Sequence, residues 1–291
     1  MITFSQINMS LINYARSGDA EMVASQLALG ANPLAGESAA LFVAAQHGHA
    51  NCVNILLHIS DPMAVECRAL LHAAKCGHSD VVRLLIPFSD PKINDSGSLI
   101  WAAENGHEEC VRLLIPHSGP AAIGTAPLRL AARNGHVGCV KLLAPFCPPD
   151  DPKDHAGAAL YSAAANNQAE CVSMLIPLAT QAKSIGSALI VAAHGCHLEC
   201  VKLLMLANPP ASELSRAFDM ALDSAQAHIV AEMISCNPAL IDLITPAHRQ
   251  EAISSGYHEL AAFLLSIQEQ QAIGDSLCAD GNPSRLRSTR I

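Results

Sequence analysis

One stretch of seven residues, HGCHLEC at positions 194–200, holds the residue types of a structural zinc site. It contains His194, Cys196, His197 and Cys200. Two histidines and two cysteines are a common tetrahedral ligand set for Zn²⁺, because imidazole nitrogen and thiolate sulfur both bind this ion well. The stretch is therefore either a metal site or an irregularity in a larger pattern.

The rest of the chain has many reactive side chains but no catalytic motif. There are 11 cysteines and 14 histidines. The chain has no nucleotide-binding glycine loop, no Gly-x-Ser-x-Gly elbow and no His-Glu-x-x-His. We therefore expect no enzyme, no cofactor and no metal. Two alternatives stay open: an enzyme or enzyme subunit with a site hidden in a groove, and a cysteine-based metal or redox sensor.

Composition excludes further classes of protein. Hydrophobic residues make up 51% of the chain, which is too many for a disordered chain, and the formal net charge is −9. An acidic protein does not attract a nucleic-acid backbone through bulk charge. No apolar run approaches the roughly 20 residues that span a bilayer. An odd number of cysteines without a basic and apolar leader favours a reducing, cytoplasmic location.

A repeat accounts for most of the sequence. LIWAAENGHEECVRLLIP, which begins at Leu99, has close copies beginning at Leu70 and Leu128, each 29 residues away. The pattern also begins at Leu41, Leu160 and Leu189, and the step before Leu160 is 32. Degenerate copies at both ends bring the total to about nine units over residues 5–270. Such a period predicts one stacked solenoid over residues 1–270, with capping units at 5–36 and 246–270.

Each unit is predicted to form two short helices. The first contains the Leu and an Ala-Ala pair, whose spacing places them on one helix face. A glycine such as Gly77 or Gly106 then ends this helix, and the second helix carries Cys-Val and Leu-Leu before a proline stops it. We expect Ser38, Ser96 and Thr125 to be N-caps. The pairs Asp80–Arg83, Glu109–Arg112 and Glu199–Lys202 are expected to be weak ion pairs on a solvated face.

The unit resembles the ankyrin repeat. The resemblance is carried by the Leu-x-x-Ala-Ala-x-x-Gly-His run and the Val-x-Leu-Leu run that follows it, and it covers about nine tenths of the chain. It implies an all-α, ankyrin-type helix-turn-helix solenoid. The ankyrin period is about 33 residues, so a period of 29 predicts shortened finger loops with little or no strand. The Ser-Asp-Pro loops resemble those of bacterial ankyrin arrays, including host-associated ones.

Two recurring positions have structural explanations. Cysteine occupies one place in the second helix of five units, as at Cys110, and Val81 holds this place in a sixth, which indicates a small apolar core position. A histidine follows the turn glycine, and the resemblance implies that it clamps neighbouring backbone. In HGCHLEC, His197 is this turn histidine and Cys200 is the core cysteine, so Cys196 takes the glycine position. We therefore interpret the stretch as a shifted turn and not as a zinc site.

The resemblance implies that another protein binds on a concave face lined by the first helices. The residues after Ala-Ala and after the repeat Leu vary in charge while their neighbours stay constant, as expected of a binding surface on a scaffold. Neutral variation at exposed positions is the alternative. The candidate partner-binding residues are Gln46, His47, Lys75, Cys76, Glu104, Asn105, Arg129, Arg133, Asn134, Tyr161, Asn166 and His194. Trp101, the only tryptophan, is expected to face the core.

Two segments fall outside the repeat. An insertion between the unit starts Leu128 and Leu160 adds a loop with Asp150, Asp151, Asp154 and His155, which is a candidate contact for the partner. Residues 271–291 carry Arg285, Arg287 and Arg290, and we expect them to form a disordered basic tail. We expect a monomer that binds a partner protein. Export into a host cell, by a route that the sequence does not display, is the alternative to a cytoplasmic location.

Overall fold

The computed structural model describes residues 4–119, 126–147, 153–179 and 181–279. The chain forms two compact units, Met1–Ser184 and Ile185–Ile291. The helices of the first unit are α1 (Phe4–Ser17), α2 (Ala20–Ala28), α3 (Ala35–Gln46), α4 (Ala50–Leu56), α5 (Ala64–Cys76), α6 (Ser79–Leu85), α7 (Ile93–Glu104), α8 (Glu108–Leu114), α10 (Ala126–Arg133), α11 (Val137–Leu143), α12 (His155–Ala165) and α13 (Ala169–Leu175). Helix α14 (Ala182–His194) contains the boundary between the units.

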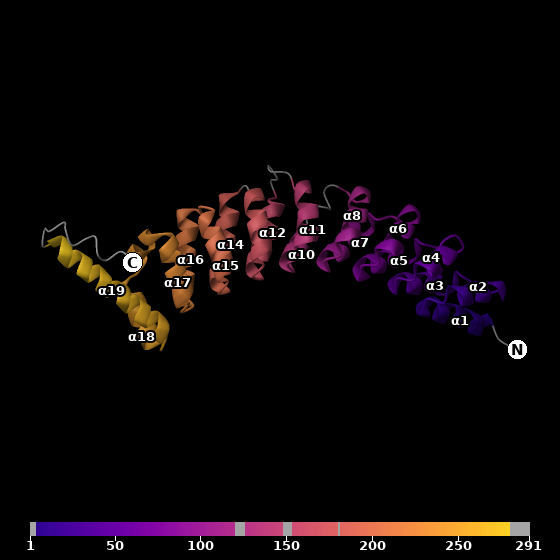
Figure 1. Ribbon diagram of the computed structural model, residues 1–291, viewed down its shortest axis with the longest axis horizontal. Helices are drawn as coiled ribbons and strands as arrows, with labels where there is room; N and C mark the ends of the chain where they lie inside the picture. Colours follow the sequence, from indigo (N-terminus) through magenta and orange to yellow (C-terminus); the bar gives the residue numbers. More distant parts are fainter. Residues whose placement is uncertain (1–3, 120–125, 148–152, 180, 280–291) are drawn as a thin grey trace. The chain divides into compact units, whose positions relative to one another are not determined.

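The first unit is a stack of helix pairs in two layers (Figure 1). The first helices of the pairs follow one another, since α1 contacts α3, α3 contacts α5, α5 contacts α7, and α10 contacts both α7 and α12. The second helices do the same, from α2 through α4, α6, α8 and α11 to α13. The described residues contain no strand, which confirms the predicted all-α fold.

The repeated apolar residues build the core of this stack. The repeat leucines Leu41, Leu70, Leu99 and Leu128 are at most 1% exposed, and the Ala-Ala pairs that follow them are fully buried. Alanine allows the helices to approach closely, and the leucines fill the space between the two layers. Burial at the same positions in every unit therefore explains why these residue types recur.

Turn glycines join the two helices of most pairs in the first unit, as the sequence predicts, and Asn167 takes this place between α12 and α13. Gly48, Gly77, Gly106 and Gly135 have φ between 76° and 79°, a left-handed conformation that costs other residues energy. A side-chain carbon on Gly77 would also lie 2.5 Å from Nδ1 of His107 in the next pair. Glycine is therefore needed at this turn for its backbone conformation and for its small size.

Four second helices, α6, α8, α11 and α13, end in short 3₁₀ turns that begin with an apolar residue and a proline. These turns are η1 (Ile86–Phe88), η2 (Ile115–His117), η3 (Ala144–Phe146) and η4 (Ile176–Leu178). Proline lacks the N–H that a continuing helix needs, which explains why the α-helix ends there.

The expectation that Ser38 and Ser96 are N-caps is wrong. Each is the last of three consecutive left-handed residues, so the backbone enters the helix through a left-handed turn. The side-chain oxygen of Ser38 instead accepts a hydrogen bond from the backbone N–H of Asp61 in the next loop, at 2.8 Å. Cys67 occupies the same position one unit later and accepts from the N–H of Asp90 at 3.3 Å. Thr125 lies outside the described residues.

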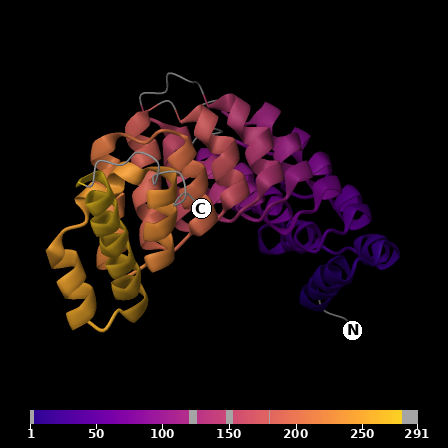
Figure 2. The ribbon, with the colours of Figure 1, turned by 60° about the vertical axis from the view of Figure 1, so that its left-hand side comes forward.

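The second unit contains most of α14 and then α15 (Leu198–Leu206), α16 (Ala211–Asp223), α17 (Ala227–Cys236), η5 (Pro238–Leu243), α18 (Pro246–Ser254) and α19 (His258–Ala279). Helix α17 contacts α15, α16 and α19, and the buried Phe218 and Met233 lie in this core. Helices α18 and α19 lie side by side at the C-terminal end (Figure 2). Helix α19 continues to Ala279, beyond residue 270, where we expected the repeats to end and a disordered tail to begin.

Candidate partner-binding site

The zinc candidate at residues 194–200 has the geometry of a shifted turn. Cys200 is 0% exposed, whereas Cys196 and His194 are exposed. Cys196 has a φ of 59°, in the left-handed region that the turn glycines occupy in other units. Across the described ranges, no three histidine, cysteine or acidic side chains are grouped so that they could hold a metal ion.

The core cysteines are protected from ionisation. Cys110 and Cys139 are at most 1% exposed, and Val81 occupies the same core position between Cys52 and Cys110. Burial raises the pKa of Cys110 to about 11 and that of Cys139 to about 12, since a thiolate would lose its hydration, and Glu109 and Glu108 respectively add repulsion. Thiols in this state are poor nucleophiles and poor metal ligands at neutral pH.

The turn histidines connect each helix pair to the pair before it. Nε2 of His78 lies 3.0 Å from the carbonyl oxygen of Gln46, and Nε2 of His107 lies 2.9 Å from that of Lys75. Nε2 must carry the proton in these bonds because a carbonyl oxygen only accepts. Gln226 replaces histidine in the second unit, and its Nε2 donates to the carbonyl oxygen of His194 at 2.9 Å. These side chains are therefore structural clamps.

The predicted partner-binding residues all lie on first helices or in the turns that follow them. Gln46, Lys75 and Glu104 are half-buried. The remaining members are exposed, namely His47, Cys76, Asn105, Arg129, Arg133, Asn134, Tyr161, Asn166 and, in the second unit, His194. In the first unit, the stacking of α3, α5, α7, α10 and α12 brings these positions into one row.

The asparagines of this row also bind backbone. Nδ2 of Asn105 donates to the carbonyl oxygen of Trp101 at 2.8 Å, and Nδ2 of Asn134 donates to that of Glu104 at 2.7 Å. Nδ2 of Asn166 donates to the carbonyl oxygen of Ser162 at 2.8 Å, four residues earlier, as Asn105 does to Trp101. These amides therefore stabilise the helix ends. The charged members of the row, such as Lys75 and Arg133, remain the stronger candidates for contact with a partner.

Aromatic rings on the same helices contact cations from α5, and sequence reasoning missed these contacts. The guanidinium carbon of Arg68 lies 3.9 Å from the centre of the Phe42 ring, and Nζ of Lys75 lies 4.2 Å from the Trp101 ring. Trp101 is half-buried, so it lies at the edge of the core and only partly as expected. The i, i+4, i+7 spacing of Arg68, His72 and Lys75 was the available signal for a shared helix face.

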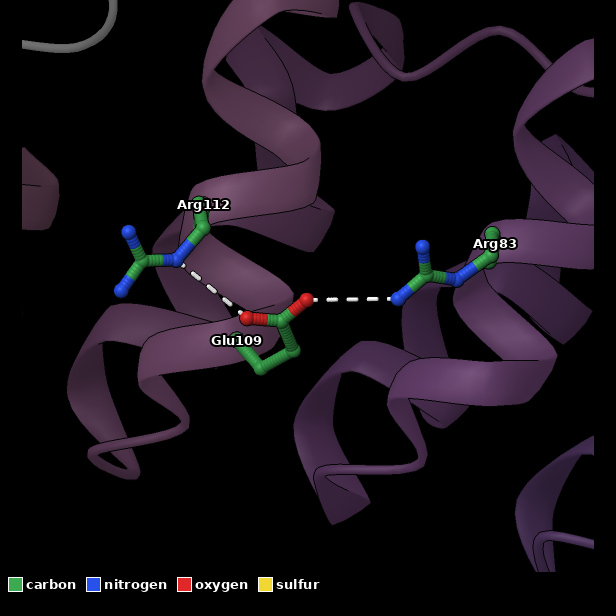
Figure 3. Close-up of polar contacts among 3 residues, drawn as sticks. All are labelled: Arg83, Glu109 and Arg112. Atoms are coloured by element: carbon green, nitrogen blue, oxygen red, sulfur yellow. Dashed lines mark hydrogen bonds and ion pairs between the residues drawn. The ribbon is translucent and has the colours of Figure 1, made fainter.

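The ion pairs on the second helices differ in part from those expected. Glu109 pairs with Arg112 at 3.3 Å, as predicted, and Glu199 pairs with Lys202 at 2.9 Å. Arg83, however, reaches across to Glu109 of the next helix pair at 3.3 Å and does not pair with Asp80 (Figure 3). The stacking distance allows this contact, which positions within one helix cannot reveal. All three side chains of this group are about half or more exposed.

Of the four candidate residues in the inserted loop, the structure describes Asp154 and His155. Asp154 caps α12 by accepting a hydrogen bond from the N–H of Gly157 at 3.0 Å, and it also accepts one from the hydroxyl of Ser184. His155 is the first residue of α12 and is half-buried. Asp150 and Asp151 lie outside the described residues, as do Arg285, Arg287 and Arg290 of the tail.

One comparison with known proteins, by sequence profile, supports the repeat assignment. The sequence profile described as Ankyrin repeats (3 copies) matches residues 11–97 and 89–153. A solved structure, the human ASB11 ankyrin repeat domain, is 19% identical, with 78% of this chain and 97% of that chain covered and a TM-score of 0.43. No match was found among curated protein sequences. No helix in the described part of the chain is long and apolar enough to cross a membrane.

Proposed function

Because the chain is an ankyrin-repeat protein, we propose that it is a non-catalytic scaffold that binds another protein through the face lined by its first helices. Ankyrin repeats are generally protein-binding scaffolds, and the side chains presented on the fold decide which partner is bound. The proposal concerns the row of candidate residues from Gln46 in α3 to Asn166 after α12.

One observation carries the proposal: the core of each pair keeps the same residue types, while the row next to it changes chemistry. The Ala-Ala pairs at 73–74, 102–103 and 131–132 are all buried. The next residue in these three units is Lys75, Glu104 or Arg133, so the charge changes sign at each step. A surface that varies on a constant scaffold is what recognition of a specific partner requires.

The decisive experiment exchanges charges within this row. The double variant Glu104→Arg with Arg133→Glu keeps the net charge and leaves the buried leucines and alanines unchanged. We expect it to lose the partner that the parent protein captures by affinity purification and mass spectrometry. If the variant captures the same partner with undiminished yield, the row does not bind it.

A matched control lies on the second helices. Glu109→Arg with Arg112→Glu is the same charge exchange on the opposite layer of the stack, at side chains that are about half or more exposed. We expect this variant to keep the partner. Thermal unfolding of both double variants would separate a loss of binding from a loss of folding.

We further propose that the protein works as a monomer in a reducing compartment, where its partner is a host protein. The buried thiols of Cys52, Cys110, Cys139 and Cys171 are unpaired, as expected where disulfides do not form. The resemblance of the loops to bacterial arrays supports a host partner. Size-exclusion chromatography with light scattering tests the monomer, and capture from host extract against bacterial extract tests the source of the partner.

A further inference from the structure

Five residues of three neighbouring first helices form what we term the cation–aromatic patch: Phe42 of α3, Arg68, His72 and Lys75 of α5, and Trp101 of α7. Helix α5 contacts α3 and α7 on its two sides (Figure 1). Arg68 lies over Phe42 and Lys75 lies over Trp101, while His72 meets the Phe42 ring edge-to-face at 5.0 Å between centroids. The rings therefore hold the two cations in place.

Both cations of the patch lack a counter-charge. In the part of the chain that the structure describes, no carboxylate forms an ion pair with Arg68 or Lys75, although the chain carries a net charge of −9. Nε of Arg68 is buried and has no hydrogen-bond partner among the described residues. Two other arginines of this unit, Arg83 and Arg112, do pair with a carboxylate.

The positive charge of Arg68 and Lys75 also affects the pKa of His72, a third residue of α5. The pKa of His72 is lowered, first by its burial and then by repulsion from Lys75 and Arg68. The neutral imidazole therefore adds no further charge to the patch at neutral pH. The patch consists of two fixed cations, a neutral histidine between them, and apolar ring surface at both ends.

We propose that the cation–aromatic patch binds an acidic segment of the partner in which two carboxylates lie four positions apart with an apolar residue midway between them. Arg68 and Lys75 are seven residues apart on one helix, which separates them by about 10 Å along the axis, and their charged ends lie over rings of two different neighbouring helices. An extended chain advances about 3.3 Å per residue, and its side chains alternate between two sides. Acidic residues four positions apart therefore point to the same side at a separation of about 13 Å, and the apolar residue between them also faces the patch and contacts the rings.

This inference rests on the proposed function, since it names the chemistry of the partner for one part of the first-helix row. Cation–π contact leaves the outer hydrogens of Lys75 available, so a carboxylate can pair with it while it stays over Trp101. A carboxylate at Arg68 would form a charge-assisted hydrogen bond, which is stronger than a neutral one.

The only tryptophan of the chain provides a direct measurement. The probe is the synthetic peptide Gly-Ser-Glu-Ser-Leu-Ser-Glu-Ser-Gly, titrated into the full chain while Trp101 fluorescence is recorded. We expect a saturable change in emission, and a shift of the His72 ring signals in NMR spectra at the same peptide concentrations. The peptide with both Glu replaced by Gln should bind at least about tenfold more weakly, because a hydrogen bond between charged groups is stronger than one to a neutral amide.

Two variants test the residues. Lys75→Met keeps the apolar stem of the side chain and should weaken the acidic peptide about tenfold, while the Gln peptide should be unaffected. Arg83→Gln removes a cation from the second-helix layer and should leave the affinity unchanged. A peptide of the same composition with adjacent glutamates, Gly-Ser-Ser-Glu-Glu-Leu-Ser-Ser-Gly, tests the spacing and should bind less tightly than the first peptide.

Equal binding of the Glu and Gln peptides, no saturable change in Trp101 fluorescence, or equal loss for Lys75→Met and Arg83→Gln would each overturn the inference. These outcomes would leave the proposed function standing, because that proposal is tested by capture of the natural partner with the Glu104 and Arg133 exchange. Conversely, the acidic peptide could bind as expected while the Glu104 and Arg133 exchange leaves capture of the natural partner unchanged. That result would contradict the proposed function and would leave the patch as a site for acidic peptides.

Discussion

The imidazole of His107 binds the backbone of Lys75, 32 residues earlier, through an Nε2–oxygen contact of 2.9 Å. The other side of the same ring lies against Gly77, because a side-chain carbon there would come within 2.5 Å of Nδ1. One histidine thus joins two helix pairs and also restricts the size of the turn residue. Equivalent contacts of His78 and His136 repeat this link along the first unit.

The contact predicts a measurable coupling between His107 and Gly77. His107→Ala should lower the free energy of unfolding by about 1–3 kcal/mol because the carbonyl of Lys75 loses its partner. Gly77→Ala should cost at least about 1 kcal/mol, from the left-handed backbone and the clash with the ring. The double variant should be less destabilised than the sum, since removal of the ring removes the clash. Urea unfolding of the four proteins measures the coupling, and strict additivity would contradict the contact.

Alkaline pH should destabilise the protein through its core cysteines. The pKa of Cys139 is raised from 9.0 to about 12, so above pH 9 the unfolded chain releases a proton that the folded chain retains. The contribution of each such thiol to the free energy of unfolding is therefore complete below pH 9. It falls by up to about 1.4 kcal/mol per pH unit as the pH rises toward 12. Cys139→Val should change stability little at pH 7 and should reduce this slope. An identical slope in variant and parent, measured by denaturant unfolding from pH 7 to 10.5, would refute the assignment.

The left-handed Cys196 offers a stabilising substitution. Its φ of 59° costs a residue with a side chain about 1–2 kcal/mol, whereas glycine adopts it freely but loses more entropy on folding. Cys196→Gly should therefore raise the free energy of unfolding by up to about 1 kcal/mol. The reverse change at an equivalent turn, Gly106→Cys, should destabilise, because its side chain would meet the ring of His136. A loss of stability in Cys196→Gly, or metal bound stoichiometrically by the parent, would show that the shifted-turn interpretation is mistaken.

The ion pairs around Glu109 should matter little for stability. Arg83, Glu109 and Arg112 are all substantially exposed, and exposed pairs contribute about 0–1 kcal/mol. Glu109→Gln should therefore lower the free energy of unfolding by less than about 1 kcal/mol, and the difference should shrink in 0.5 M salt because of screening. A larger and salt-insensitive loss would mean that Glu109 has a packing role that its exposure does not suggest.

His72 should make the protein sensitive to mild acid. Burial, Lys75 and Arg68 lower its pKa below the ordinary value of 6.5, so the unfolded chain takes up a proton that the folded chain does not. The contribution of His72 is complete above pH 6.5 and is lost as pH falls below it. His72→Gln should reduce the loss of stability between pH 7 and pH 5, relative to the parent, in thermal unfolding. The exposed His194→Gln serves as the control and should follow the parent curve.

Positions that repeat every 29 residues could be interpreted from the sequence alone. The repeat leucines and Ala-Ala pairs had to be buried, the glycine after them had to end a helix, and cysteine or valine had to share one small core position. These conclusions follow from side-chain size, burial and backbone conformation, which act within a unit. They are sufficient to predict stacked helix pairs and to explain HGCHLEC as a displaced turn.

The contacts between units were decided only by the tertiary structure. Arg83 binds Glu109 of the next pair and not Asp80 of its own helix. The hydroxyl of Ser38 accepts a hydrogen bond from the backbone N–H of Asp61 in the next loop and does not cap its own helix. Arg68 lies over the ring of Phe42 in the pair before it. Helical periodicity places a side chain on a face but does not specify how far a long side chain reaches across to a neighbouring helix. That reach depends on the spacing and rotation of stacked pairs, which are set by packing of the whole core.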